Sequence, residues 1–300
     1  MYNPATIPKM KKIFPSRTAA LLVLFMMAIS LNACNNSERY TLKMRLDQGD
    51  HFEQDMKTVM EMNTPVMGKA MNMKMDIEVG CAFDVIKKDA SGTQLKMSYS
   101  RNKTKMDMGA LNGLNGATDS LLNRQNSSLN GKSVVLVLSN NNQIKEVIGA
   151  ENIFSGDSTD EATKKMMQKM FSKDQIANLW GMMFSMYPKK PVRVGDSWKG
   201  ETQANMGGFD MTINMKYKLT AVTNGLAEIE VDGIIDGKGK MTEMPMEMDM
   251  KGSQKGTMTI KLSDGYLQKG KYKMDVTANM EMMGQKIPMT LKGDYSITGK

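Results

Sequence analysis

Methionines at every second position are the side chains whose type and spacing most suggest chemistry. The sequence holds 35 methionines. The candidate ligand-lining residues in alternating runs are Met71, Met73, Met75, Met244, Met246, Met248, Met250, Met280 and Met282. Residues two apart on a strand point to the same side and lie roughly 6.5–7 Å apart. Two thioethers of such a run can therefore converge on one ion or one apolar ligand.

Three interpretations of these methionines are open. The first is core packing, since methionine is apolar and fills irregular gaps. The second is a plastic apolar cavity for a lipid or another apolar ligand, because flexible methionine-rich surfaces adapt to what they bind. The third is soft-metal binding, since thioethers select Cu(I) and Ag(I). Against the third, no histidine or cysteine stands beside these motifs as a further ligand.

Residues for catalysis are scarce. The single histidine, His51, lies in the polar stretch DQGDHFEQD, where we expect a solvated surface residue. One histidine argues against a Ser-His-Asp triad and against a multi-histidine metal site. Cys81 lies in the apolar, strand-like run DIEVGCAFDVI and is interpreted as a small core residue. Glycine-rich nucleotide loops and HExxH are absent from the sequence, so we predict no enzymatic activity, no cofactor and no metal centre.

The first 33 residues have the composition of a signal peptide. Four basic residues and no acid precede an uncharged apolar run of 13 residues, AALLVLFMMAISL (19–31). This run is too short to span roughly 30 Å of hydrocarbon. Removal of residues 1–33 takes away only those four charges, so the net charge falls from +8 to +4. Lysines and acids are interspersed in the remainder, and we expect no nucleic-acid binding.

The four residues LNAC (31–34) follow the apolar run directly. They resemble the lipobox that the signal peptidase of bacterial lipoproteins recognises. The resemblance implies that Cys34 is the first mature residue, with diacylglycerol on its sulfur and a third acyl chain, such as palmitate, on its amine. Several acyl chains give stable anchoring, because each buried CH₂ contributes about 0.8 kcal/mol. Residues 34–39 would then be a tether to the membrane.

Alternating apolar residues dominate the mature chain and predict long antiparallel strands with one polar face. Asn224-Gly225 and Asp264-Gly265 are expected to form two-residue turns with positive φ. Pro245 has no backbone N–H to donate to a strand ladder. The stretch MTEMPMEMDM (241–250) should therefore be an edge strand of the sheet or begin one. We predict a mainly β (α+β) fold, with long antiparallel strands in a curved sheet or half-barrel.

The apolar period lengthens to helical spacing between residues 158 and 187. Capping boxes are predicted at Ser158 with Glu161 and at Ser172 with Gln175. Two helices are therefore expected between two sets of strands. The predicted domain is a single β-rich unit, with strands in 40–150, helices in 158–187 and strands in 191–300.

The segment PKKPVRVGDSW (188–198) resembles part of a family of outer-membrane lipoproteins of unknown function from Bacteroidetes-type bacteria. This resemblance implies no activity. Locally, Gly195, Asp196 and Trp198 predict a tight turn whose tryptophan anchors the next strand. In the resembled bacteria an acidic run after the lipidated cysteine favours export to the cell surface. The residues after Cys34 are NNSERY, so we expect the periplasmic face of the outer membrane.

These observations lead to a working hypothesis. The protein is a non-enzymatic envelope lipoprotein, held to the membrane through lipidated Cys34, that binds a lipid or another apolar ligand in a methionine-lined concavity. The first alternative is a structural or partner-binding envelope protein with a packed core. The second alternative is a soft-metal protein that binds Cu(I) or Ag(I) through Met-x-Met motifs.

Overall fold

The structure is a computed structural model that describes residues 38–66, 69–109, 129–153, 172–206, 209–241, 246–282 and 284–300. The chain divides into two units, Met1–Glu38 and Arg39–Lys300. The described residues belong almost entirely to the second unit. Cys34, the predicted first helix and Met244 lie outside the described residues.

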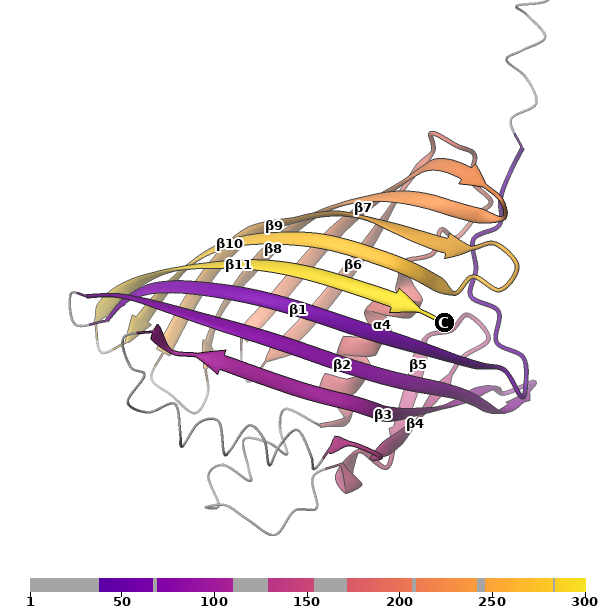
Figure 1. Cartoon of the computed structure of the whole chain (residues 1–300), viewed down its shortest axis with the longest axis horizontal. Coiled ribbons are helices and arrows are strands. Elements are labelled where there is room, and N and C mark those ends of the chain that lie inside the picture. The colour runs from indigo at the N-terminus through magenta and orange to yellow at the C-terminus, as the bar shows by residue number, and fades with distance from the viewer. Residues whose placement is uncertain are drawn as a thin grey trace, which may run out of the picture. The chain divides into compact units, whose positions relative to one another are not determined.

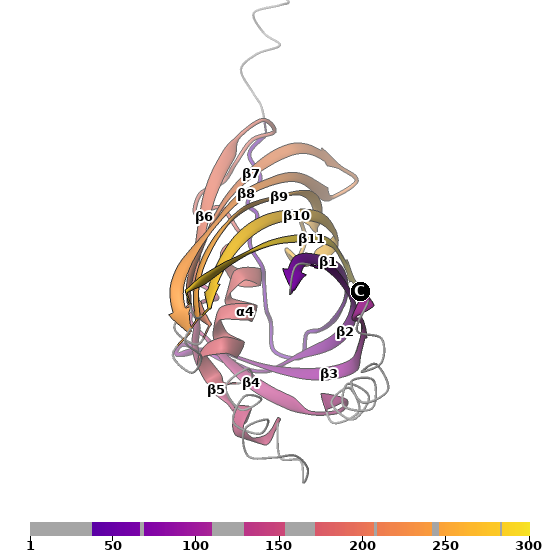
Figure 2. The same ribbon diagram turned by 90° about the vertical axis from the view of Figure 1, so that its left-hand side faces the viewer.

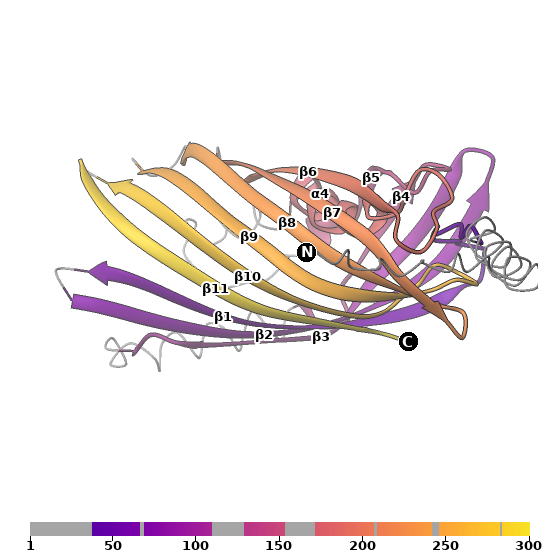
Figure 3. The ribbon, with the colours of Figure 1, turned by 90° about the horizontal axis from the view of Figure 1, so that it is seen from above.

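Eleven strands of the described part form one antiparallel sheet. The first set is β1 (His51–Val66), β2 (Lys69–Asp89), β3 (Gly92–Asp107), β4 (Ser133–Leu138) and β5 (Ile144–Ile148). The second set is β6 (Ser197–Met206), β7 (Phe209–Thr223), β8 (Leu226–Met241), β9 (Met246–Lys261), β10 (Leu267–Met282) and β11 (Gln285–Gly299). The sheet order is β5-β4-β3-β2-β1-β11-β10-β9-β8-β7-β6, so each set is a meander and the two meet where β1 pairs with β11 (Figures 1 and 3).

Between the two sets lie a short 3₁₀ helix, η2 (Ala150–Asn152), and the helix α4 (Lys173–Ser185). The start of α4 matches the sequence prediction, because the Ser172 hydroxyl accepts a hydrogen bond from the Gln175 backbone N–H at 3.4 Å. Seen from one end, the sheet curls around α4 (Figure 2). The prediction of a mainly β protein with a curved antiparallel sheet is therefore confirmed.

Glycines on the face toward α4 allow neighbouring strands of the curved sheet to come close together. A Cβ on Gly252 would lie 2.5 Å from Val276 Cγ2 and 2.6 Å from the Asp275 carbonyl oxygen. A Cβ on Gly256 would lie 2.1 Å from the Lys271 carbonyl oxygen. Only glycine fits such positions, and glycines inside strands are a common means of bending a sheet.

The turns confirm one prediction and correct another. Asn224 and Gly225 have φ of 52° and 75° and form the expected two-residue hairpin between β7 and β8. The connection at Asp264-Gly265 instead spans residues 262–266, and of these two residues only Gly265 has positive φ. The prediction of a two-residue turn was wrong there, because the Asp264 carboxylate accepts the Tyr266 backbone N–H at 2.9 Å and holds a wider loop.

Pro245 itself lies outside the described residues, and the edge position expected for its strand was wrong. The strand β9 begins at Met246, directly after the proline, and pairs with β8 on one side and β10 on the other. It is therefore an interior strand, and the edges of the sheet are β5 and β6. A proline before the first paired residue costs the ladder no donor.

Fully buried side chains gather in two clusters near one end of the strands. The first cluster contains stacked Phe52 and Phe83, whose ring centroids lie 4.7 Å apart, and Trp180 of α4 packs edge-on against Phe83. The second cluster lies on the later strands and includes Leu219 and Ile229. Residues Tyr40–Asp50, here called the strap, run between them: Leu42 belongs to the second cluster and Met44 and Leu46 to the first.

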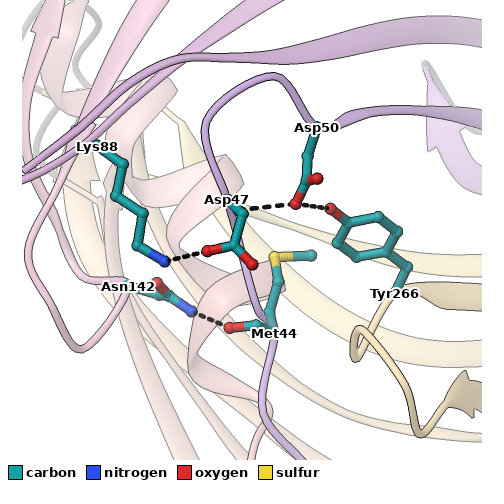
Figure 4. A network of polar contacts seen from close by, with 6 residues as sticks. All are labelled: Met44, Asp47, Asp50, Lys88, Asn142 and Tyr266. Atoms are coloured by element: carbon teal, nitrogen blue, oxygen red, sulfur yellow. Dashed lines mark hydrogen bonds and ion pairs between the residues drawn. The ribbon is translucent and has the colours of Figure 1, made fainter.

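Polar contacts hold the strap to both strand sets (Figure 4). The Asn142 amide donates to the Met44 carbonyl at 2.8 Å, and Lys88 pairs with Asp47 at 2.7 Å. From the second set, the Tyr266 hydroxyl donates to an Asp50 carboxylate oxygen at 3.1 Å. We call the end of the sheet where the strap lies the strap end.

The strap should contribute strongly to stability through its buried side chains. Replacing Met44, which is 1% exposed, with alanine is expected to lower the free energy of unfolding by about 2–5 kcal/mol. Urea unfolding of residues 35–300 measures the change. The matched control is Met182→Ala on the exposed side of α4, where a change of less than about 0.5 kcal/mol is expected. Equal effects of the two substitutions would contradict a structural role for the strap.

Candidate ligand-binding face

Beyond the buried clusters, the face of the sheet toward α4 carries half-buried methionines. Strand alternation places them on the same side as the core, since Met60 lies eight residues after buried Phe52 on β1. Outward neighbours such as Lys74 and Asp249 are exposed. We call this surface the methionine face, and its half-buried members are Met60, Met62, Met71, Met73, Met75, Met106, Met248, Met250, Met280 and Met289.

The strand register brings these side chains together from distant parts of the sequence. On β1 and β2, Met60 lies opposite Met75 and Met62 lies opposite Met73, so four thioethers form a two-by-two block. Directly opposed residues of antiparallel strands have Cβ atoms about 4.5–5.5 Å apart, within reach of these side chains. Met106 of β3 extends the block, because it lies opposite Met75.

The later strands continue the same surface. Met280 of β10 lies opposite Met248 of β9, and Ala278 lies between Met250 of β9 and Met289 of β11. Because β1 is the neighbour of β11, the methionine face crosses six adjacent strands from β3 to β9. It is thus one continuous surface and not two separate ones.

Six of the nine methionines chosen from sequence lie on this face with described side chains: Met71, Met73, Met75, Met248, Met250 and Met280. The backbones of Met246 and Met282 are paired with each other, but their side chains are not described. Met244 lies entirely outside the described residues. The ligand-lining set chosen from sequence did not include Met60, Met62, Met106 and Met289. The alternation in VMEMN (59–63) was the available signal for the first two.

Exposure separates two kinds of methionine. Met44 and Met97 are 1% and 0% exposed and are ordinary core residues. The members of the methionine face are half-buried, so part of each side chain remains accessible to a ligand. Among described residues, no group of three or more histidines, cysteines, aspartates or glutamates is placed to hold a metal ion. The face can therefore offer an apolar, deformable surface or a set of thioether ligands.

Cys81 and His51 lie where the sequence suggested. Cys81 is 1% exposed, and burial, helped by the Asp55 carboxylate, raises the pKa of its thiol to about 12. Such a thiol is not a nucleophile at neutral pH. His51 is exposed on β1, with Nδ1 2.7 Å from the Asp84 carboxylate and Nε2 3.8 Å from that of Glu53. The pairing with Asp84 was not foreseen, because it depends on the register of β1 and β2.

The turn at 193–196 also agrees with prediction. Gly195 has φ of 96°, and the Asp196 carboxylate accepts the Arg193 backbone N–H at 2.8 Å. The Trp198 indole N–H donates to the Met186 carbonyl at 2.8 Å, and its ring stacks on Tyr217. These residues fix the start of β6 against the end of α4.

With this geometry described, comparison with known sequences decides the family. Residues 90–267, more than half of the chain, match the model of a family of unknown function (DUF6263). The chain belongs to this family. The matched DUF6263 segment contains the VGDSW motif but not LNAC, so it confirms a family of unknown function and does not test the lipobox or a bacterial lineage. No curated protein sequence matches the chain.

Three solved structures illustrate what this chain is similar to. Lipovitellin, from a structure of its lipid–protein interactions, is 8% identical with a TM-score of 0.46; the match covers 85% of this chain but only 25% of lipovitellin. An outer membrane channel from Pseudomonas putida is 8% identical with a TM-score of 0.22, covering 86% and 97% of the two chains. A DUF1329 family protein from Desulfovibrio piger is 11% identical with a TM-score of 0.17, covering 91% and 90%.

Within the described ranges, no helix is both long and apolar enough to cross a bilayer.

The single histidine gives a direct test of the β1–β2 register. The hydrogen bond with Asp84 raises the pKa of His51 above 6.5, against an opposing effect of partial burial. The pair therefore stabilises the fold fully below about pH 6.5, and this contribution is lost as the pH rises through the folded pKa. An NMR titration should show one imidazole with a raised pKa. Asp84→Asn should return it toward 6.5, and an unchanged titration would contradict the pairing.

Proposed function

We propose that this protein is a non-enzymatic lipoprotein of the cell envelope that holds a lipid or another apolar ligand against the methionine face. The observation that carries the proposal is the continuity of half-buried methionines over six adjacent strands. A large, partly exposed apolar surface in a protein with otherwise polar outward positions is typical of a binding surface.

Methionine suits a ligand of variable shape. Its side chain is unbranched, with three rotatable bonds, and it packs against irregular apolar surfaces. Each methylene group of a ligand that leaves water for this face contributes about 0.8 kcal/mol. An acyl chain with about ten such groups would gain several kcal/mol even after the cost of ordering.

The envelope location is supported by the sequence before the described residues. A basic stretch, a short apolar run and LNAC precede the domain, and Cys34 is the residue that would carry the lipid. We propose attachment to the outer membrane, on its periplasmic face. A structural or partner-binding envelope protein remains the alternative, in which the methionine face would contact another protein.

A specific observation also favours a second candidate function. The block of Met60, Met62, Met73 and Met75 places four thioethers in direct cross-strand register, and thioethers are ligands for Cu(I) and Ag(I). A soft-metal site would therefore lie within the same face, and one set of variants separates the two functions.

The anchor has a direct test. The mature full chain is expected to begin at Cys34 and to carry diacylglycerol and a third acyl chain, which intact mass spectrometry of the membrane fraction measures. Cys34→Ala should leave the precursor unprocessed, since the lipid acceptor is lost. Cys81→Ala is the matched control and should be processed normally. A mature chain without added lipid mass would refute the anchor.

The ligand is tested by native mass spectrometry of residues 35–300 exported with a cleavable signal. A solvent-extractable mass of several hundred daltons is expected to copurify. Met62→Glu with Met73→Glu should abolish it, because two carboxylates would be placed against an apolar ligand. Val59→Glu with Asn72→Glu places the same charges on the outward side of the same strands and should retain it.

Leucine substitutions at Met60, Met62, Met73 and Met75 distinguish the two candidate functions. They keep the apolar volume and remove the sulfurs, so the copurified ligand should persist. Stoichiometric Cu(I) uptake that these substitutions abolish would instead favour the metal site. If only the mass of the protein itself is found, both with and without Cu(I), both candidate functions would be rejected.

A further inference from the structure

Near the N-terminal end of the described residues, Tyr40 is held in place by backbone hydrogen bonds. The Tyr40 backbone N–H donates to the Val192 carbonyl at 2.7 Å, and the Val192 N–H donates back to the Tyr40 carbonyl at 3.0 Å. Leu42 is buried two residues later. From Tyr40 back to Cys34 there are six residue steps, which reach at most about 20 Å when fully extended. A lipid on Cys34 would therefore hold the surroundings of Val192 close to the membrane.

The segment beside that point is basic. Residues 188–199, here called the basic loop, contain Lys189, Lys190, Arg193 and Lys199, all exposed, and a single acid, Asp196. One oxygen of the Asp196 carboxylate is already engaged by the Arg193 backbone N–H. None of the ion pairs found among described residues involves these four cations.

The basic loop also exposes an aliphatic side chain and is held rigidly. Val194 is 48% exposed, between the cations. The Gly195 N–H donates to the Leu219 carbonyl at 2.7 Å, and the Leu219 N–H donates to the Asp196 carbonyl at 3.0 Å. The loop thus presents its charges from a fixed backbone, at little further cost in conformational entropy on binding.

We propose that the basic loop is a membrane-contact surface that binds the anionic headgroups of the phospholipid leaflet carrying the anchor. The inference rests on the proposed lipid anchor. Lysine and arginine near an anionic leaflet are attracted over about one Debye length, roughly 8–10 Å, and act together with an acyl anchor. The charge of the loop is complementary to that of an anionic leaflet, and the reach from Cys34 to Tyr40 is short.

This contact orients the methionine face. The basic loop runs into the first residues of β6, and the β7–β8 turn at Asn224-Gly225 lies at the strap end as well. From that turn, β8 runs through Leu226–Met241, and a strand of that length spans on the order of 50 Å. Met248 and Met250, paired with the far half of β8, therefore lie well away from the membrane contact.

The test uses the full chain, processed and reconstituted through its own anchor into vesicles of phosphatidylcholine with or without phosphatidylglycerol. Val194→Cys is labelled with a polarity-sensitive fluorophore; buried Cys81 does not compete. A blue shift is expected with phosphatidylglycerol only. It should be reversed at about 1 M salt, where the Debye length falls to about 3 Å.

Two matched controls give the test its specificity. Lys189→Gln, Lys190→Gln and Arg193→Gln together should lower the ratio of bound to free loop on the order of 100-fold. Lys251→Gln, Lys255→Gln and Lys271→Gln remove the same charge from the outward face of β9 and β10 and should leave the shift intact. A fluorophore at exposed Thr290 should show no shift.

The outcomes separate this proposal from the one on which it rests. An anchored chain without a shift, or with the same shift on neutral vesicles, would overturn the membrane-contact surface and leave the anchor standing. Loss of the shift in the β9–β10 control variant would also overturn it, since net charge and not the loop would be responsible. A mature chain without lipid would overturn both.

Discussion

The pairing of β1 with β11 is the constraint on which the rest of the structure depends. These strands come from opposite ends of the domain, and their antiparallel ladder from Gln54 with Gly299 to Asn63 with Thr290 makes two meanders into one sheet. Without this ladder, the methionines of β2 and those of β9 would lie on separate sheets. The long sequence separation makes the pairing entropically costly to form, and burial along the seam must offset that cost.

The strap determines which part of the inner face is core and which is surface. Leu42, Met44 and Leu46 fill the strap end between the two buried clusters, and α4 packs beside them. Inner-face residues farther along the strands have the same apolar character but less cover, so they stay half-buried. The apolar side chains of one alternating strand thus stabilise the core at the strap end, whereas those at the other end of the same strand are accessible for binding.

Charge and apolar surface occupy different parts of the molecule. The inner face is methionine-rich, whereas outward positions alternate lysine and acid, with pairs such as Lys57 and Glu78 at 3.1 Å. Exposed pairs of this kind add little stability but keep the outer face solvated. Among the described residues, the four cations of the basic loop take part in none of the ion pairs found, and the loop lies beside Tyr40, six residues after Cys34 in the sequence. An anchor, a headgroup contact and a distant apolar face would together give the domain a fixed orientation.

The sequence by itself determined the local elements. Alternation defined the strands, Asn224-Gly225 supplied a turn with positive φ, Ser172 capped a helix, and the apolar surroundings of Cys81 predicted its burial. Each of these depends on residues within a few positions, so a single sequence contains the signal. Only the tertiary structure decided the strand order, the His51 pair with Asp84 and the exposure of the methionines. Alternating strands are interchangeable as partners until long-range packing selects among them, and burial depends on what the strap and α4 cover, which no local pattern encodes.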